Sequence, residues 1–482
     1  MRTDRSRTAP RPHHAGALLA IIVVSTLIRS AAALVVPLLD DEAHYWVWSR
    51  HLMWGYPDHP PMIAALVAVG TWLLGDSAPG IRLFPVLLGT ASTVVLYVLT
   101  RRLFSPSAGL RAALLFQVLP AFAAGGIIAA PDAPLGFFWL AAMLFGWMAT
   151  RGVGWAWPAA GAAVGLAVQS KLAGGALALS LAGFVLTTPS GRGWLRTRWP
   201  YLAAATGALV LVPLVRWNAA HEWATLTRAL VVDPWIEPMT APANVAAFVG
   251  SQFVYYGPLG FPILLAALAA VAARARRDDR FRLLLWGAAP TLLVVALSST
   301  RALAKPHYTA PALLSALIAA VALWPQWRPQ RLLRAGVLTS LAVTLAAIVL
   351  AAVPTPVSSA FHQEAAGWHQ VACEIERVAP TLGRPGEVFV LAETYQAGSQ
   401  IAFALQERLP VVVPFRGFVL WQPPARWVGR NGVLVDHLAG APFDALSGAF
   451  ERLESPFVVP IGAGRAVRLY PGINFRGLGG SP

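Results

Sequence analysis

The residue types best suited to chemistry concentrate in one stretch near the N-terminus, DDEAHYWVWSRHLMWGYPDHPP. In a helix over residues 40–50, Asp41 shares one face with Trp48, because side chains three, four and seven apart line one side of a helix. Either His44 or Tyr45 lies between them. Sugar rings stack on aromatic side chains, and carboxylates accept protons from hydroxyl groups. The pattern therefore predicts an acid beside aromatic rings, suited to a sugar.

The end of the same stretch, GYPDHPP, places Asp58 and His59 before two prolines. Proline fixes the backbone and favours the first turn of a helix, so a second short helix is expected to follow at the membrane surface. Tryptophans of an interfacial belt and solvated loop acids would explain each residue singly. The chain has only 22 Asp and Glu residues, and their concentration in one loop favours a functional interpretation.

Four further connections between apolar segments carry polar residues. For each, a simpler interpretation exists, such as a helix N-cap for Asp132 or a lysine that extends to the membrane surface for Lys171. Their joint occurrence on the side with few positive charges suggests an anionic partner such as a phosphate. The connections are APDAPLGFFW with Asp132, QSKLAGG with Lys171, RWNAAHEW with His221 and Glu222, and STRALAKPHYTAP with Arg301, Lys305 and His307.

These groups together suit a reaction on a substrate that has a lipid tail, a phosphate and a sugar. A carboxylate acting as general base removes the proton from an acceptor hydroxyl, while cations stabilise the departing lipid phosphate. The sequence contains nothing that requires a soluble nucleotide.

The elements that position these residues are membrane helices. The chain is 57% hydrophobic and only 12% charged, so it must have a surface that faces lipid. The formal charge of +15 would suggest nucleic acid in a soluble protein, but here the arginines fall between apolar spans. The single cysteine, Cys373, excludes an intramolecular disulfide.

About eleven spans follow from a length of roughly twenty apolar residues each. We place them at 16–39, 80–100, 108–129, 133–149, 153–169, 172–188, 199–216, 245–272, 282–299, 308–324 and 335–353. Most arginines then fall on one side, which the positive-inside rule makes cytoplasmic, with the N-terminus. The loop 40–79 and everything after residue 354 fall on the external side of what we expect to be a bacterial plasma (inner) membrane.

The chain changes character after residue 353, so we expect a transmembrane domain over 1–353 and a C-terminal extracytoplasmic α/β domain over 354–482. The predicted strands lie in EVFVLAE, LPVVVPF, NGVLVDH and AVRLYPG, around a helical YQAGSQIAFALQ.

These motifs resemble the polyprenyl-phosphate-sugar-dependent glycosyltransferases of the GT-C superfamily, in the branch that holds protein O-mannosyltransferases, lipid A aminoarabinose transferases and rhizobial galacturonosyltransferases. The resemblance covers most of the chain. The matching segments are DDEAHYWVWSRHL with WGYPDHPP, APDAPLGFFW, GLAVQSKLAGG, WNAAHEW, KPHYTAP and ETYQAGSQIAFAL.

The resemblance implies transfer of a sugar from a polyprenyl monophosphate carrier to an acceptor on the external face, with inversion at the sugar and an essential acid in the first loop. That acid is Asp41 if the family's Asp-Glu pair aligns with Asp41 and Glu42, although Asp40 is adjacent. The family's Glu-Lys-Pro-Pro motif is Asp58–His59–Pro60–Pro61 here, so the lysine's phosphate role cannot simply pass to His59. The candidates for phosphate contact are Lys171, Arg301, Lys305 and His307.

A transporter or flippase of lipid-linked saccharides is the alternative, and a non-catalytic assembly factor is a third. Transporters usually show repeated halves and polar residues near the bilayer midplane, whereas this chain concentrates polar residues at one face. The sugar, the anomeric outcome and the acceptor stay open, whether lipid A or core, glycolipid, polysaccharide or protein. Metal dependence also stays open, because Asp41, Glu42, Asp58 and His59 have oxygen and nitrogen ligands that a cation could use.

Overall fold

The computed structural model describes residues 12–230, 240–302, 304–414, 416–437, 446–462 and 465–478. The chain divides into two compact units. The helical unit comprises the described residues of Met1–Ala33, His59–Ile63 and Phe84–Ile348, and the mixed unit comprises those of Leu34–Asp58, Ala64–Leu83 and Val349–Pro482. The predicted boundary between residues 353 and 354 stays a prediction.

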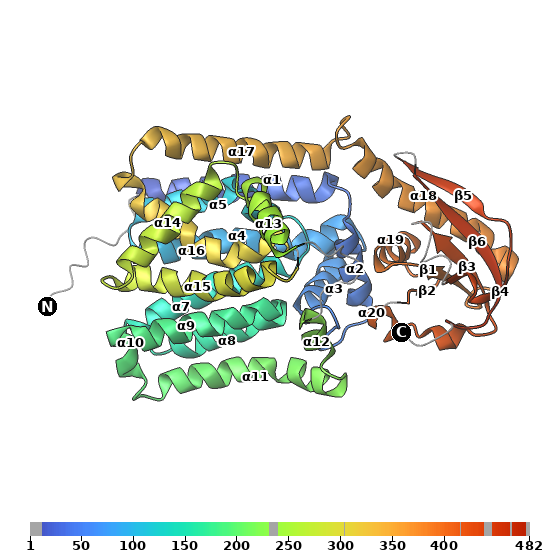
Figure 1. Cartoon of the computed structure of the whole chain (residues 1–482), viewed down its shortest axis with the longest axis horizontal. Coiled ribbons are helices and arrows are strands. Elements are labelled where there is room, and N and C mark those ends of the chain that lie inside the picture. Colours follow the sequence, from blue (N-terminus) through green and yellow to red (C-terminus); the bar gives the residue numbers. More distant parts are fainter. Residues whose placement is uncertain are drawn as a thin grey trace. The chain divides into compact units, whose positions relative to one another are not determined.

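Long apolar helices build the helical unit (Figure 1). Trp139, Leu284 and Leu317 are buried among them, whereas Leu19, Leu209 and Leu338 are 61%, 70% and 64% exposed. In water such exposure would be unfavourable, so these side chains mark a surface that faces lipid. The helices are α1 (Pro12–Val35), α4 (Ala78–Leu103), α5 (Pro106–Val118), α6 (Pro120–Gly125), α7 (Asp132–Thr150), α8 (Ala156–Ser170), α9 (Gly175–Thr187), α10 (Pro189–Trp194), α11 (Trp199–Ala220), α12 (Ala224–Leu230), α13 (Ala241–Tyr255), α14 (Gly260–Arg274), α15 (Asp279–Ser299), α16 (Ala310–Leu323) and α17 (Gln330–Ala352), with short 3₁₀ helices η2 (Leu172–Gly174), η3 (Pro306–Thr309) and η4 (Trp324–Gln326). The end of α1 from Leu34, the start of α4 up to Leu83 and the end of α17 from Val349 belong to the mixed unit.

Among the described residues, seven helices are long and apolar enough to cross a membrane, or eight if one bent pair counts as a span. The polytopic helical fold is therefore confirmed, and the count of about eleven stays a prediction. The bent pair is α13 and α14, which meet at 105° where we expected a continuous span over 245–272. Gly257 has φ +85 at the break, and a side chain there would collide with Ser340 of α17.

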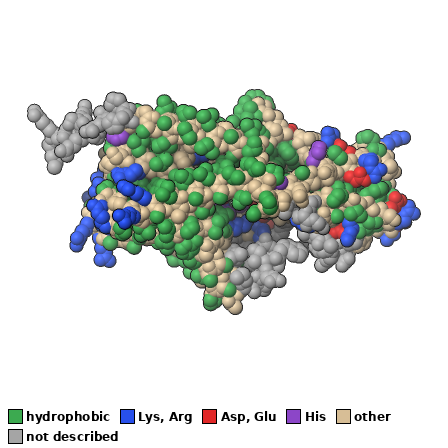
Figure 2. Space-filling model, turned by 90° about the horizontal axis from the view of Figure 1, so that it is seen from above, with side chains coloured by type: hydrophobic (Ala, Val, Ile, Leu, Met, Phe, Trp, Pro, Cys, Tyr) green, Lys and Arg blue, Asp and Glu red, His purple; other side chains and the backbone are tan. Residues whose placement is uncertain are grey.

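Positive charge collects at one end of the helical unit, as Figure 2 shows, while hydrophobic side chains cover much of its surface. Arg151, after α7, lies 3.3 Å from Asp279 at the start of α15. Arg280 donates to the carbonyl of Leu103, at the end of α4, at 3.4 Å. Three connections that we predicted on the arginine-rich side therefore meet. Which compartment they face stays a prediction.

The mixed unit contains a six-stranded sheet in the order β2-β1-β3-β6-β4, with β5 also paired to β6 (Figure 1). β1 pairs in parallel with β2 and β3, whereas β6 is antiparallel to its neighbours. Phe389, Leu434 and Phe475 lie in its core. The elements are α2 (Asp40–Arg50), α3 (Met62–Leu74, whose first two residues belong to the helical unit), α18 (Ser359–Leu382), β1 (Val388–Ala392), α19 (Tyr395–Leu405), β2 (Val411–Val412), α20 (Arg416–Val419), η5 (Pro424–Trp427), β3 (Asn431–Asp436), β4 (Phe450–Leu453), β5 (Phe457–Gly462) and β6 (Arg465–Phe475).

The predicted C-terminal α/β region is thus confirmed. Its four predicted strands coincide with β1, β2, β3 and β6, and its predicted helix coincides with α19. The two helices expected in the first loop, over 40–50 and after the Pro-Pro pair, are α2 and α3.

Candidate functional site

Helix α2 begins at Asp40 because Glu42 closes its first turn. The Glu42 carboxylate accepts from the backbone N–H of Leu39 at 3.1 Å, which satisfies a donor that has no partner inside the helix. Glu42 also pairs with Arg82, whose Nε donates to its Oε1 at 2.8 Å, and both side chains are fully buried. Arg82 further donates to the carbonyls of Val36 at 2.6 Å and Pro37 at 2.8 Å. This buried pair fixes the direction in which α2 leaves the preceding segment.

Helix α19 holds the exposed acids of α2 from within the same unit. The Tyr395 hydroxyl donates to Asp41 Oδ1 at 3.2 Å, and Gln400 Nε2 donates to Asp40 Oδ1 at 2.9 Å. Burial raises the pKa of the Tyr395 phenol, and the nearby carboxylates of Asp41, Asp58 and Asp40 raise it further. Tyr395 therefore remains a neutral donor, and the three acids surround it.

The predicted aromatic face of α2 is present. The rings of His44 and Tyr45 lie 4.8 Å and 5.4 Å from that of Trp48, between centroids. Trp48 also stacks in parallel on Tyr56 at 4.2 Å. Tyr45 and Trp48 are only 5% and 0% exposed. They therefore support the helix in the structure, and their contact with a substrate stays a prediction.

A second polar cluster lies within the helical unit. Asp132 begins α7, and Lys171 lies at the break between α8 and η2, where its extended backbone (φ −158, ψ 139) ends the helix. Lys171 Nζ donates to both carboxylate oxygens of Asp132 at 3.0 Å. His307 of η3 approaches the same carboxylate at 3.8 Å, and the Lys171 ammonium lies 5.1 Å from the Tyr308 ring. Three connections predicted to share one side thus meet here.

His59 belongs to this helical-unit cluster. Burial lowers the pKa of His59 to about 3. The positive charges of Lys171 and Lys305 lower this pKa further, whereas the negative charge of Asp132 raises it. The imidazole is therefore neutral near pH 7 and does not replace the charge of a lysine. Lys305, just before η3, is exposed.

The remaining candidates lie elsewhere in the helical unit. His221 ends α11, where its ring stacks on Trp217 at 4.2 Å and its Nδ1 lies 2.7 Å from the Trp217 carbonyl. Glu222 follows with φ 54, a left-handed conformation that is uncommon outside glycine. Arg301 is exposed after α15. Among the described residues, no hydrogen bond or ion pair joins these three to the Asp132 cluster.

Sequence reasoning assigned no role to Arg82, Tyr395 or Gln400. An arginine inside an apolar span was a signal for Arg82, because a buried charge needs a partner. Tyr395 and Gln400 lay in a segment that we quoted only for its resemblance. Among the described residues, no group of three or more His, Cys, Asp or Glu side chains is arranged to hold a metal ion.

Comparison with known proteins bears on the family and the fold. Residues 58–217 match the model of the dolichyl-phosphate-mannose-protein mannosyltransferase family. The lipid A galacturonosyltransferase RgtD of Rhizobium johnstonii is 33% identical over 299 residues, which cover 59% of this chain and 61% of that protein. The chain thus spans about three fifths of the length of this curated relative.

Solved structures share the fold. ArnT from Cupriavidus metallidurans in the apo state superposes with a TM-score of 0.67 at 17% identity, covering 94% of this chain and 98% of that one. ArnT bound to undecaprenyl phosphate gives 0.65, also at 17% identity, covering 94% and 97%. The oligosaccharyltransferase of Archaeoglobus fulgidus gives 0.51 at 16% identity, covering 82% and 62%. The chain therefore has the fold of ArnT with a segment typical of the mannosyltransferase family, which confirms its resemblance to the GT-C polyprenyl-phosphate-sugar glycosyltransferases.

Proposed function

We propose that the protein transfers a sugar, a hexose or a pentose, from a polyprenyl monophosphate carrier to an acceptor in the cell envelope. The acceptor class comprises lipid A or core, glycolipid, polysaccharide and protein. The reaction takes place at the external face of a bacterial inner membrane, with the N-terminus cytoplasmic and the C-terminal region external. Two similar proteins support this proposal: RgtD is a lipid A galacturonosyltransferase, and ArnT was solved bound to undecaprenyl phosphate.

The observation that carries the proposal is the environment of Asp41. Its neighbours in α2 have partners that fix them, Arg82 for Glu42 and the Gln400 amide for Asp40. Asp41 is exposed in the first turn, and its Oδ1 accepts from the neutral Tyr395 hydroxyl. In the proposal its other oxygen takes the proton of the acceptor hydroxyl. Glu42 is then a positioning residue, which orients the turn that carries Asp41.

The bond changes follow from this assignment. The deprotonated acceptor oxygen bonds to the anomeric carbon of the donor, and the bond from that carbon to the phosphate oxygen breaks. The electron pair leaves with the polyprenyl phosphate. A single displacement of this kind inverts the anomeric centre.

The leaving phosphate needs positive charge, and we assign that task to cations of the helical unit. The Lys171 charge is largely balanced by Asp132, at 3.0 Å from both oxygens. The exposed Lys305 and Arg301 therefore supply the net attraction, with His307 as a hydrogen-bonding neighbour. His59, Asp58, Tyr45, Trp48, Asp132, His221 and Glu222 stay predicted contacts of the sugar or the acceptor.

The test compares Asp41→Asn with Asp40→Asn in proteoliposomes supplied with purified polyprenyl-phosphate sugars and an envelope extract. The two side chains are adjacent, exposed and of equal size, so Asp40→Asn is a matched control. We expect label to enter an acceptor with wild type and Asp40→Asn, and transfer to fall at least a hundredfold with Asp41→Asn. Full activity of Asp41→Asn would refute the base assignment. Movement of donor across the bilayer without transfer would favour a flippase.

A further inference from the structure

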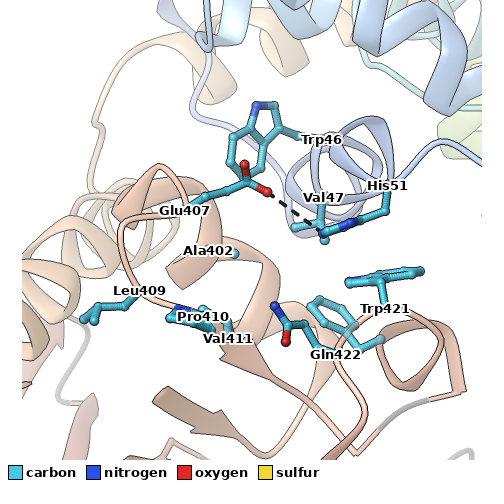
Figure 3. A pocket seen from close by; sticks show the side chains of 11 residues that line it. Trp46, Val47, His51, Ala402, Glu407, Leu409, Pro410, Val411, Trp421 and Gln422 are labelled. Atoms are coloured by element: carbon cyan, nitrogen blue, oxygen red, sulfur yellow. Dashed lines mark ion pairs between the residues drawn. The ribbon is translucent and has the colours of Figure 1, made fainter. Parts of the chain in front are cut away.

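The mixed unit has a pocket of about 110 Å³ that the proposed reaction does not use. Figure 3 shows it between α2 and the chain from α19 to α20. Its walls are largely aromatic and aliphatic, and three polar side chains reach it. The aromatic and polar lining residues are Trp46, Phe418, Trp421, His51, Glu407 and Gln422.

The charges around the pocket leave an excess of one negative charge. Arg50 balances Asp76, which lies 3.4 Å away. His51 lies 3.9 Å from Glu407 and stacks on Trp421 at 5.1 Å. Burial lowers the pKa of His51, and Arg50 lowers it further, so the imidazole is neutral near pH 7. Among the described residues that line the pocket, Glu407 meets no lysine or arginine. Burial raises the pKa of the Glu407 carboxyl; Arg50, whose guanidinium lies 5.4 Å from the Trp46 ring, lowers this pKa, and Asp76 raises it.

The backbone holds Glu407 at this position. Gln406 and Glu407 have φ 48 and 57 directly after α19, and two consecutive left-handed residues that are not glycine carry a conformational cost. Such strain persists where surrounding contacts fix it. The Glu407 carboxylate is half-exposed, at 51%, so it lies where a ligand can reach it from solvent.

A second hydrogen-bond acceptor in the pocket lacks a donor. Gln422 Oε1 is buried, and no donor in the described part of the chain reaches it. A buried amide oxygen without a partner costs roughly 1–3 kcal/mol, so a donor from a ligand would be favourable there.

From these contacts we propose that the pocket binds a protonated primary amine. The ammonium group donates hydrogen bonds to the Glu407 carboxylate and to the Gln422 amide oxygen. Aromatic rings such as that of Trp421 attract a cation through their π faces. A pocket of this volume admits the amine and a few carbons, so an amino sugar and an ethanolamine group are the two sources of this chemistry. The proposal does not depend on glycosyl transfer.

The experiment measures binding of four small ligands to the purified full-length protein by saturation-transfer NMR. D-glucosamine and ethanolamine carry the ammonium group. D-glucose and N-acetyl-D-glucosamine are matched ligands without that charge. We expect glucosamine to bind about tenfold more tightly than glucose or N-acetylglucosamine. Equal binding of ethanolamine would identify the amine alone as the ligand, and preference for glucosamine would add contacts to the ring.

Variants tie the binding to this pocket. Glu407→Gln keeps the shape and removes the charge, and it should abolish the preference for the amine. Glu454→Gln is the control, because Glu454 is similarly exposed, at 48%, and pairs only with Arg452 at the surface in the described contacts. Equal affinity for glucose and glucosamine would overturn the proposal, as would an unchanged preference in Glu407→Gln. Both binding measurements are made without a polyprenyl-phosphate sugar. Their outcome would therefore stay the same if the protein proved not to be a glycosyltransferase.

Discussion

Replacing Arg82 by methionine tests the buried pair that fixes α2. The substitution keeps an extended side chain but strands the Glu42 carboxylate, which is 0% exposed. Removing one partner of a buried ion pair costs about 3–5 kcal/mol, and full burial leaves no solvent screening to reduce that cost. The carbonyls of Val36 and Pro37 lose their donors as well. We therefore expect Arg82→Met to be among the most destabilising single changes in the mixed unit.

The assay is the thermal midpoint of detergent-solubilised protein, read by size-exclusion chromatography after heating. This loss of unfolding free energy corresponds to a fall of the thermal midpoint by roughly 10 °C for a unit of this length. The double variant Glu42→Gln, Arg82→Met removes the stranded charge, and the amide oxygen that it introduces can still accept from the N–H of Leu39, so it should regain much of the loss. A single variant as stable as wild type, or a double variant no better than the single, would refute the reasoning.

Three further outcomes follow from the described contacts. Lys171→Met should lower the thermal midpoint by stranding Asp132, and adding Asp132→Asn should restore most of it; a midpoint unchanged in the single variant would contradict this pairing. The pKa of His59 falls from 6.5 to about 3 on folding, so the unfolded chain binds a proton at this side chain more readily than the folded protein does. The contribution of His59 to the free energy of unfolding should therefore be complete above pH 6.5 and decline as the pH falls toward 3. His59→Asn should reduce that decline, as measured by melting curves over this pH range. Trp48→Ala should cost about 3–5 kcal/mol, because it leaves a cavity beside Tyr56, whereas Trp48→Phe should cost less; equal midpoints for the two variants would count against the stacking.

Local patterns predicted much of the fold. The spacing of Asp41 and Trp48 predicted the helical face of α2, and alternating apolar residues predicted β1 and β3. The break between α13 and α14 was missed, because the apolar run continues through it; the adjacent Gly257 and Pro258 were the available signal.

Long-range pairs were beyond the reach of sequence spacing. Glu42 and Arg82 are forty positions apart, and Asp132 and Lys171 are thirty-nine apart, so only packing decides that they meet. The sequence placed Asp132 and Lys171 on one side of the membrane. It treated Lys171 as a phosphate ligand without revealing that Asp132 balances its charge.

The bend between α13 and α14 decides whether these two helices count as one membrane crossing or as two. Gln252 of α13 donates to the carbonyl of Pro306 at 3.1 Å, so the bend lies at the end of the helical unit that holds His307 and Asp132. Arg274, at the far end of α14, lies 5.9 Å from the Phe281 ring, beside the arginine-rich connections. Only α14 therefore traverses the unit, with fifteen residues and a rise of about 22 Å. Counting the two helices as separate crossings would exchange the predicted membrane sides of all later connections.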